Sequence, residues 1–170
     1  MTLRLPVLWQ SSPAAFWLVV ACLVYYVWMA ARLTVIDIRS HLLPNRIVLP
    51  SYWAAAPLSL AAALGNGAFD GGAILRVLGG GVVLWLVYFV LRLVYPAGMG
   101  FGDVKLAGVL GFYLGYLSWE HLLWGTAAAF LLGGLFGLGL IVLRLGTGKT
   151  AIPFGPFMLV GAALALLLPA

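Results

Sequence analysis

Cysteine and charge are scarce in this chain of 170 residues, and each scarcity excludes a class of structure. Cys22 is the single cysteine, so the chain forms neither an internal disulfide nor a metal site built from several cysteines. We expect it to pack as a small hydrophobic residue. Charged residues make up 8% of the sequence and hydrophobic residues 65%, with a mean hydropathy of +1.15. The composition therefore indicates an integral membrane protein surrounded by a lipid bilayer.

Basic residues outnumber acidic ones, with nine Lys and Arg against four Asp and Glu and a formal net charge of +5. The cations are scattered singly along the chain and form no cluster or basic face. This pattern argues against a nucleic-acid partner and is typical of the short connections between membrane helices.

Long apolar runs predict an all-α, polytopic membrane protein with about six transmembrane helices. The runs cover residues 14–36, 47–64, 74–94, 104–117, 122–142 and 152–168, and turn-forming residues separate them. No internal repeat or linker divides the sequence, so we expect a single transmembrane domain over residues 1–170.

Most cations lie near alternate breaks between these runs, which predicts the orientation of the chain. Seven of the nine flank the first, third and fifth breaks: Arg32, Arg39, Arg46, Arg92, Lys105, Arg144 and Lys149. By the positive-inside rule, these breaks face the cytoplasm and both termini lie outside a plasma (inner) membrane. Arg4 ahead of the first run also fits a secretory signal peptide, but the run is long and Arg32 follows it at once, which favours a retained helix.

Two of the four acidic residues, Asp37 and Asp103, lie at breaks that the charge pattern assigns to the same side. A carboxylate at a membrane edge is costly to keep, which indicates a functional role. Two nearby carboxyls in a low-dielectric site share one proton and titrate apart, so one activates water while the other donates a proton. The pair therefore predicts an aspartic protease.

The glycine-rich segment before Asp103 is expected to shape this site. Gly98, Gly100 and Gly102 alternate up to the acid, and residues without Cβ allow positive φ and the close approach of another backbone. The helix predicted after Asp103 has 14 residues and reaches about 21 Å, less than the hydrocarbon thickness of about 30 Å. Asp103 is therefore expected below the membrane surface, in the wall of a cavity.

Other residues near the two aspartates leave more than one interpretation open. Lys105 either favours the ionised form of Asp103 or anchors the helix at the membrane edge. Asn45, which follows Pro44, either contacts a substrate or caps the second helix, and its position favours the cap. Further glycine pairs at helix-packing spacing lie inside apolar runs: Gly111 with Gly115, and Gly133 with Gly137.

Two other motifs do not carry the function. The segment Gly146-Thr-Gly-Lys-Thr150 is similar to a phosphate-binding loop, but Leu143 stands where that motif needs glycine. Ser118, Glu120 and His121 are expected at the end of the molecule opposite the aspartates, and their closeness in the sequence does not make them a catalytic triad.

Several motifs together resemble the type IV prepilin peptidases and the archaeal preflagellin peptidases. Gly100-Phe-Gly-Asp103, continued by Val-Lys-Leu106, is similar to the signature that these enzymes share with presenilin-type proteases. Asp37 followed at a distance by Leu43-Pro44-Asn45 is similar to the second hallmark of the family, and Pro153-Phe-Gly-Pro156 looks like a family segment. The resemblance covers residues 33 to about 160, in the family order.

This resemblance implies an intramembrane aspartic endopeptidase that removes the short basic leader from type IV pilin-like precursors at the cytoplasmic face. Asp37 and Asp103 would be the catalytic pair, with water as nucleophile and with no cofactor or metal. The chain resembles a short form without the cysteine-containing zinc insert, so N-methyltransferase activity is not expected. Arg39, Arg46 and Lys105 are candidates to bind a glutamate that follows the cleavage point in such precursors.

Two other classes of function are compatible with the same residues. A small proton- or cation-coupled transporter would use Asp37 and Asp103 to relay protons or bind cations near the middle of the membrane. A non-catalytic partner in pilus or secretion assembly would tolerate the loss of either carboxylate. The oligomeric state, the precursor, and a role in pili, secretion or competence stay open.

Overall fold

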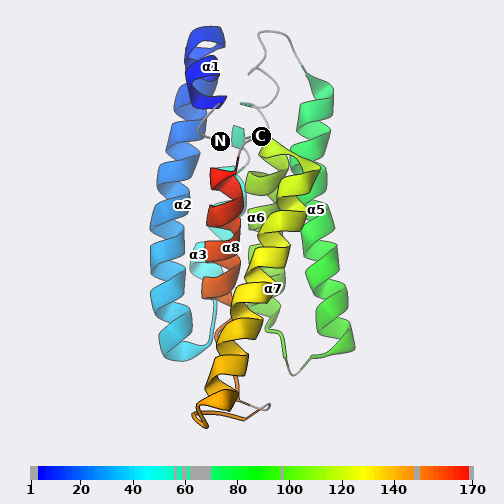
Figure 1. Ribbon diagram of the computed structural model, residues 1–170. Coiled ribbons are helices and arrows are strands. Elements are labelled where there is room, and N and C mark those ends of the chain that lie inside the picture. The colour runs from blue at the N-terminus through cyan, green and yellow to red at the C-terminus, as the bar shows by residue number, and fades with distance from the viewer. Residues whose placement is uncertain are drawn as a thin grey trace.

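The structure, a computed structural model, describes residues 4–55, 57, 58, 61, 70–96, 98–147 and 150–168. Every regular element in these residues is a helix, which confirms the all-α prediction. The helices form one elongated bundle (Figure 1). They are α1 (Arg4–Ser11), α2 (Pro13–Ser40), α3 (Asn45–Ala55), α5 (Gly71–Val94), α6 (Phe101–Leu117), α7 (Trp119–Val142) and α8 (Gly155–Leu167).

Helices α2, α5 and α7 are long and apolar enough to cross a membrane, and α8 is a shorter apolar helix. Five of the predicted runs correspond to α2, α5, α6, α7 and α8. Helix α6 begins three residues earlier than predicted, so Asp103 is part of its first turn. The second run, 47–64, begins as α3, and its remainder lies largely outside the described residues. Helix α1 was not predicted.

Several polar residues of the sequence serve as helix caps. The Ser12 side chain accepts a hydrogen bond from the amide of Ala15 at the start of α2. Asp70 accepts in the same way from Ala73 at the start of α5, at 3.1 Å, and Ser118 caps α7. These contacts satisfy backbone donors that have no partner within the helix. Asp70 and Ser118 therefore have structural roles.

Helix α6 lies at the centre of the bundle, and thirteen of its seventeen residues are buried. It packs closely on α5 because both helices carry glycines at the contact. A Cβ atom at Gly80 would lie 2.6 Å from the carbonyl oxygen of Gly111, and one at Gly115 would lie 2.7 Å from that of Arg76. The packing role predicted for Gly111 and Gly115 is confirmed, since any larger residue would separate the two helices.

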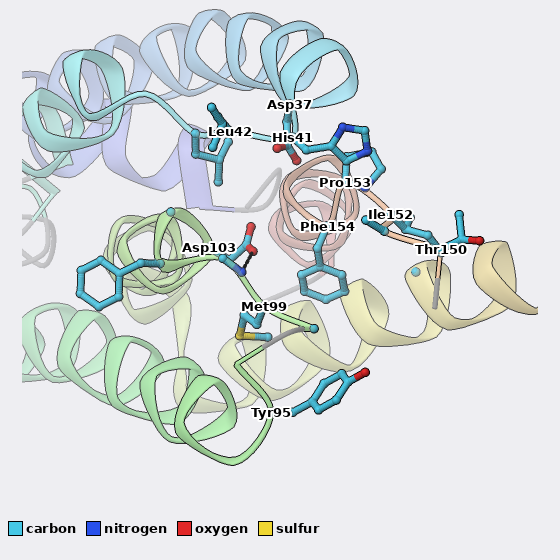
Figure 2. A pocket seen from close by; sticks show the side chains of 17 residues that line it. Asp37, His41, Leu42, Tyr95, Met99, Asp103, Thr150, Ile152, Pro153 and Phe154 are labelled. Carbon is cyan, nitrogen blue, oxygen red and sulfur yellow. Dashed lines mark hydrogen bonds between the residues drawn. The ribbon is translucent and has the colours of Figure 1, made fainter. Parts of the chain in front are cut away.

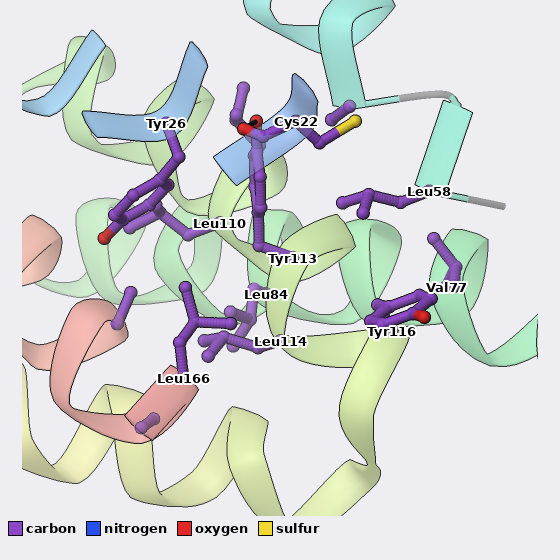
Figure 3. Packing of buried hydrophobic residues seen from close by; sticks show 14 of the residues in the cluster. Cys22, Tyr26, Leu58, Val77, Leu84, Leu110, Tyr113, Leu114, Tyr116 and Leu166 are labelled. Atoms are coloured by element: carbon purple, nitrogen blue, oxygen red, sulfur yellow. Dashed lines mark hydrogen bonds between the residues drawn. The ribbon is translucent and has the colours of Figure 1, made fainter. Parts of the chain in front are cut away.

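Two tyrosines connect the central helix and its neighbours within the apolar core. The Tyr113 hydroxyl of α6 donates to the Cys22 carbonyl of α2 at 3.0 Å, and the Tyr26 hydroxyl donates to the Leu159 carbonyl of α8 at 2.6 Å. Cys22 is 3% exposed and unpaired, as expected of a packed hydrophobic residue. Figure 3 shows this cluster, to which Leu110, Leu114 and Leu166 also belong. These contacts set the position of α6 relative to α2 and α8.

The connections after α2, α5 and α7 lie together at one end of the bundle, the lower end in Figure 1. The connection between α6 and α7, which contains Ser118, lies at the other end. This alternation is the one expected from the charge pattern. It brings the end of α2 and the start of α6 to the same end of the molecule. Lys149, one of the cations used in that prediction, lies outside the described residues.

Candidate active site

Asp37 and Asp103 line one cavity of about 640 Å³ at this end of the bundle. The cavity walls also come from the connection after α2, the loop before α6 and the segment before α8. Figure 2 shows the two side chains pointing into the cavity from different elements, Asp37 from α2 and Asp103 from α6. Asp37 is 4% exposed and Asp103 8% exposed. Residues 66 positions apart are therefore brought to one largely buried site.

Asp37 is held by the start of α8. Its Oδ2 atom accepts a hydrogen bond of 3.0 Å from the backbone amide of Gly155, the first residue of that helix. The N-terminal end of a helix carries partial positive charge and favours an anion. The contact requires glycine, because a Cβ atom at position 155 would lie 2.7 Å from Oδ2 of Asp37 and 3.3 Å from Cδ2 of Leu43.

The chain turns sharply after Asp37. The amide of His41 donates to the Asp37 carbonyl at 2.8 Å, and His41 adopts a left-handed conformation with φ of 53°. This conformation ends α2 and directs the following residues along the cavity, so that His41 and Leu43 contribute to its wall.

Asp103 is held by its own helix. Its Oδ2 atom accepts a hydrogen bond of 2.9 Å from the amide of Gly100, and its amide donates to the Gly100 carbonyl at 3.2 Å. The carboxylate thus satisfies a free amide at the positive end of α6. Among the described residues, Oδ1 of Asp37 and Oδ1 of Asp103 have no hydrogen-bond partner. Each acid therefore has one oxygen fixed by the backbone and a second one free for water or substrate.

The loop glycines Gly98, Gly100 and Gly102 lie close to the side chains of neighbouring residues. None of Gly98, Gly100 and Gly102 lies in the left-handed region, and Gly100 has φ of −70°, so these positions do not use the positive φ that glycine allows. A Cβ atom at Gly102 would lie 2.8 Å from Cβ of Leu43, and one at Gly98 would clash with the Tyr95 ring. Gly98 and Gly102 therefore leave room for neighbouring side chains.

Lys105 points away from the cavity. Its Nζ atom donates to Oδ1 of Asn45 at 3.0 Å and lies 5.0 Å from the centre of the Phe101 ring. Asn45 is the first residue of α3, and the carbonyl of Pro44 accepts from the amides of Ile47 and Val48. The predicted capping role of Asn45 is therefore wrong, since Pro44 occupies the cap position.

The two predicted substrate-binding arginines, Arg39 and Arg46, are exposed at the same end of the bundle and do not line the cavity. Arg39 lies in the last turn of α2 and Arg46 in the first turn of α3. They are placed to contact a ligand only at the rim of the site.

Sequence reasoning missed two contributors to the site. Arg92 donates to the Met99 carbonyl at 2.8 Å and lies 5.3 Å from the centre of the Phe101 ring, so it holds the loop before α6. Gly155 holds Asp37. The segment Pro153-Phe-Gly-Pro156 resembles a family segment, but nothing local in it indicates a contact with a residue 118 positions away. No group of three metal-binding side chains occurs among the described residues.

Comparison with known proteins identifies the family of this chain. The model of the type IV leader peptidase family matches residues 23–138, which include both aspartates and the glycine loop. The chain belongs to the type IV leader peptidase family. The resemblance found in the sequence motifs is thereby confirmed.

Curated relatives in the type IV leader peptidase family match most of this chain. The prepilin leader peptidase/N-methyltransferase of Aeromonas salmonicida (strain A449) is 37% identical over 141 residues, which cover 82% of this chain and 46% of the relative. The proteins of the same name from Aeromonas hydrophila and Pseudomonas putida are 36% and 33% identical, each over 82% of this chain and 47% of the relative. The chain spans about half the length of the curated relatives it matches. No solved structure matches it.

Proposed function

We propose that this chain is an intramembrane aspartic endopeptidase that removes the basic leader from type IV pilin-like precursors, with Asp37 and Asp103 as its catalytic pair. The observation that carries the proposal is the convergence of two buried carboxylates on one cavity, each with one oxygen held by a backbone amide. Membership of the type IV leader peptidase family and the names of the relatives support the choice of substrate.

The reaction needs one proton shared between the two carboxyls. The ionised member takes a proton from water, and the resulting hydroxide adds to the carbonyl carbon of the scissile peptide. The protonated member donates to the carbonyl oxygen. When the carbon–nitrogen bond breaks, the amine leaves with a proton from the pair, and the new carboxyl group returns one. The burial of both groups favours this singly protonated state, which belongs to the pair as a whole.

The free Oδ1 atoms would contact the water and the peptide, while the Oδ2 atoms keep the acids in place. A cavity of about 640 Å³ is of the size that ligand sites have. Gly98, Gly100 and Gly102 shape its wall by admitting neighbouring side chains. The hydrogen bond from Lys105 to Asn45 joins the starts of α3 and α6, and the Pro44 carbonyl caps α3. Neither arrangement calls for a metal or an organic cofactor.

The same end of the bundle carries most of the cations, so we place it at the cytoplasmic face of the inner membrane and both termini outside. Arg39 and Arg46 at the rim would attract an acidic group that follows the cleavage point. The terminal position of the cavity also favours a protease over a transporter, whose ion site would lie near the middle of the membrane.

The test is leader removal from a co-expressed pilin-like precursor, followed by gel mobility. We expect Asp37→Asn and Asp103→Asn each to abolish processing while the protein stays in the membrane. Asp70→Asn is the matched control, since Asp70 caps α5 at the opposite end. Continued processing by either active-site variant contradicts the catalytic assignment.

The relatives' names also include N-methyltransferase, an activity that we do not expect here. Supplying a labelled methyl donor during processing tests this expectation. Label in the processed product would overturn it without affecting the assignment of the peptidase.

A further inference from the structure

The buried central helix α6 has one open side outside the aspartate site. Its partly exposed residues are Phe101, Gly102, Lys105 and Phe112. Phe101, Lys105 and Phe112 follow one another at intervals of four and seven residues, which places them on one face of the helix. This face forms the floor of a second groove, of about 840 Å³.

The walls of this groove are two helices that flank α6 without touching each other. Helix α3 contributes Leu49, Tyr52 and Trp53, and helix α5 contributes Gly81, Val82, Trp85 and Leu86. Both helices pack on α6, and within the described part of the chain no contact joins α3 to α5. Figure 1 shows them on different sides of α6. The gap between them is open to the membrane, as the 83% exposure of Trp53 and the 58% exposure of Val82 indicate.

The groove and the aspartate cavity share a wall. Phe101 lines both of them and lies two residues before Asp103. From Phe101 to Phe112 the floor extends over eleven residues, or about 16 Å and three turns of α6. The groove therefore starts beside the aspartate cavity and runs along the bundle away from that end.

We propose that this groove between α3 and α5 binds the apolar helix of the polypeptide whose cleavage point lies between Asp37 and Asp103. This inference rests on the proposed function. A precursor anchored in the membrane has its apolar segment covalently joined to the scissile peptide, so that segment must leave the cavity along a surface continuous with it. This groove meets the condition, since it faces the membrane and shares the lining residue Phe101 with the cavity.

The chemistry of the groove agrees with that occupant. Lys105 is its single charged residue and the other lining residues are apolar, aromatic or glycine. The positive charge of Lys105 disfavours a basic leader in the groove. The leader therefore stays on the cavity side, and the apolar segment of the precursor enters the groove. Helices in a membrane associate by close packing, and a gap between two helices over a third offers three surfaces at once. The apolar segment of the precursor fits the groove better than a lipid chain does, because a lipid chain has no covalent link to the scissile peptide.

The test fills the groove and measures cleavage of two substrates. Val82→Trp places a large side chain in the groove, and Val83→Trp is the matched control, because Val83 is 41% exposed and lies outside the lining. We expect Val82→Trp to raise KM for a full-length precursor about five- to tenfold, which corresponds to about 1.0–1.4 kcal/mol of binding free energy. Cleavage of a short peptide that spans the cleavage point but lacks the apolar segment should stay unchanged, and Val83→Trp should affect neither substrate.

A photoreactive side chain provides a second readout. Placed at position 86, which lines the groove, it should form an adduct with the full-length precursor, and placed at position 87, which does not, it should form none. Adducts with lipid alone at position 86, or equal KM values for Val82→Trp and Val83→Trp, overturn the groove assignment. Absence of cleavage by the unmodified protein would instead refute the proposed function, so the two failures are distinguishable.

Discussion

Replacing Gly155 with alanine should impair catalysis while leaving the fold intact. The added Cβ would lie 2.7 Å from Oδ2 of Asp37, closer than real Cβ atoms approach other atoms, and Leu43 at 3.3 Å blocks a shift to that side. The backbone amide that bonds Asp37 is retained in alanine, so the hydrogen bond itself is not deleted. The carboxylate or the start of α8 must therefore move away from its present position.

The expected magnitude follows from the sensitivity of catalysis to position. A displacement of about 1 Å in a catalytic group costs about 100-fold in rate. This factor corresponds to about 2.7 kcal/mol in activation free energy. The effect on stability should be small, because the closest atom to the added Cβ belongs to the Asp37 side chain, which lines the cavity and can move into it.

The assay is kcat/KM for precursor processing by purified protein in detergent, with thermal unfolding measured on the same samples. Gly134→Ala in α7 is the matched control, because a Cβ there meets nothing within 4 Å. Gly155→Ala with control-like kcat/KM would refute the idea that the start of α8 positions Asp37. A large loss of thermal stability would show instead that position 155 matters for folding.

The remaining predictions concern the shared proton and the helix packing. Processing should fall at both low and high pH, because the Asp37–Asp103 pair lacks a base when both acids are protonated and lacks an acid when both are ionised. A processing rate that rises steadily across the pH range would contradict the shared proton. Gly111→Leu should lower the free energy of unfolding by about 1–3 kcal/mol by forcing α5 away from α6, whereas Gly139→Leu should not, since a Cβ at Gly139 meets nothing within 4 Å. Thermal unfolding in detergent compares the two, and equal midpoints would argue against close packing as the reason for glycine.

The sequence alone determined the membrane class, the positions of α2, α5, α6, α7 and α8, and the placement of the two aspartates at one end. Apolar runs and cations are local signals, because each residue partitions between lipid and water largely by its own chemistry. Alternating connections then bring Asp37 and Asp103 to the same end without any knowledge of packing. The motifs around Asp103 and Pro44 were sufficient to recognise the type IV leader peptidase family.

Only the tertiary structure decided which contacts hold the aspartates and which surfaces meet them. The bond from Gly155 to Asp37 and the contact between Lys105 and Asn45 join residues 118 and 60 positions apart, and no local pattern specifies such pairs. The same limit explains why the cap of α3 was predicted wrongly. Backbone angles and cap partners depend on side chains such as Leu43 and Tyr95, whose positions follow from packing. The groove beside α6 also exists only because α3 and α5 pack on the same helix without touching.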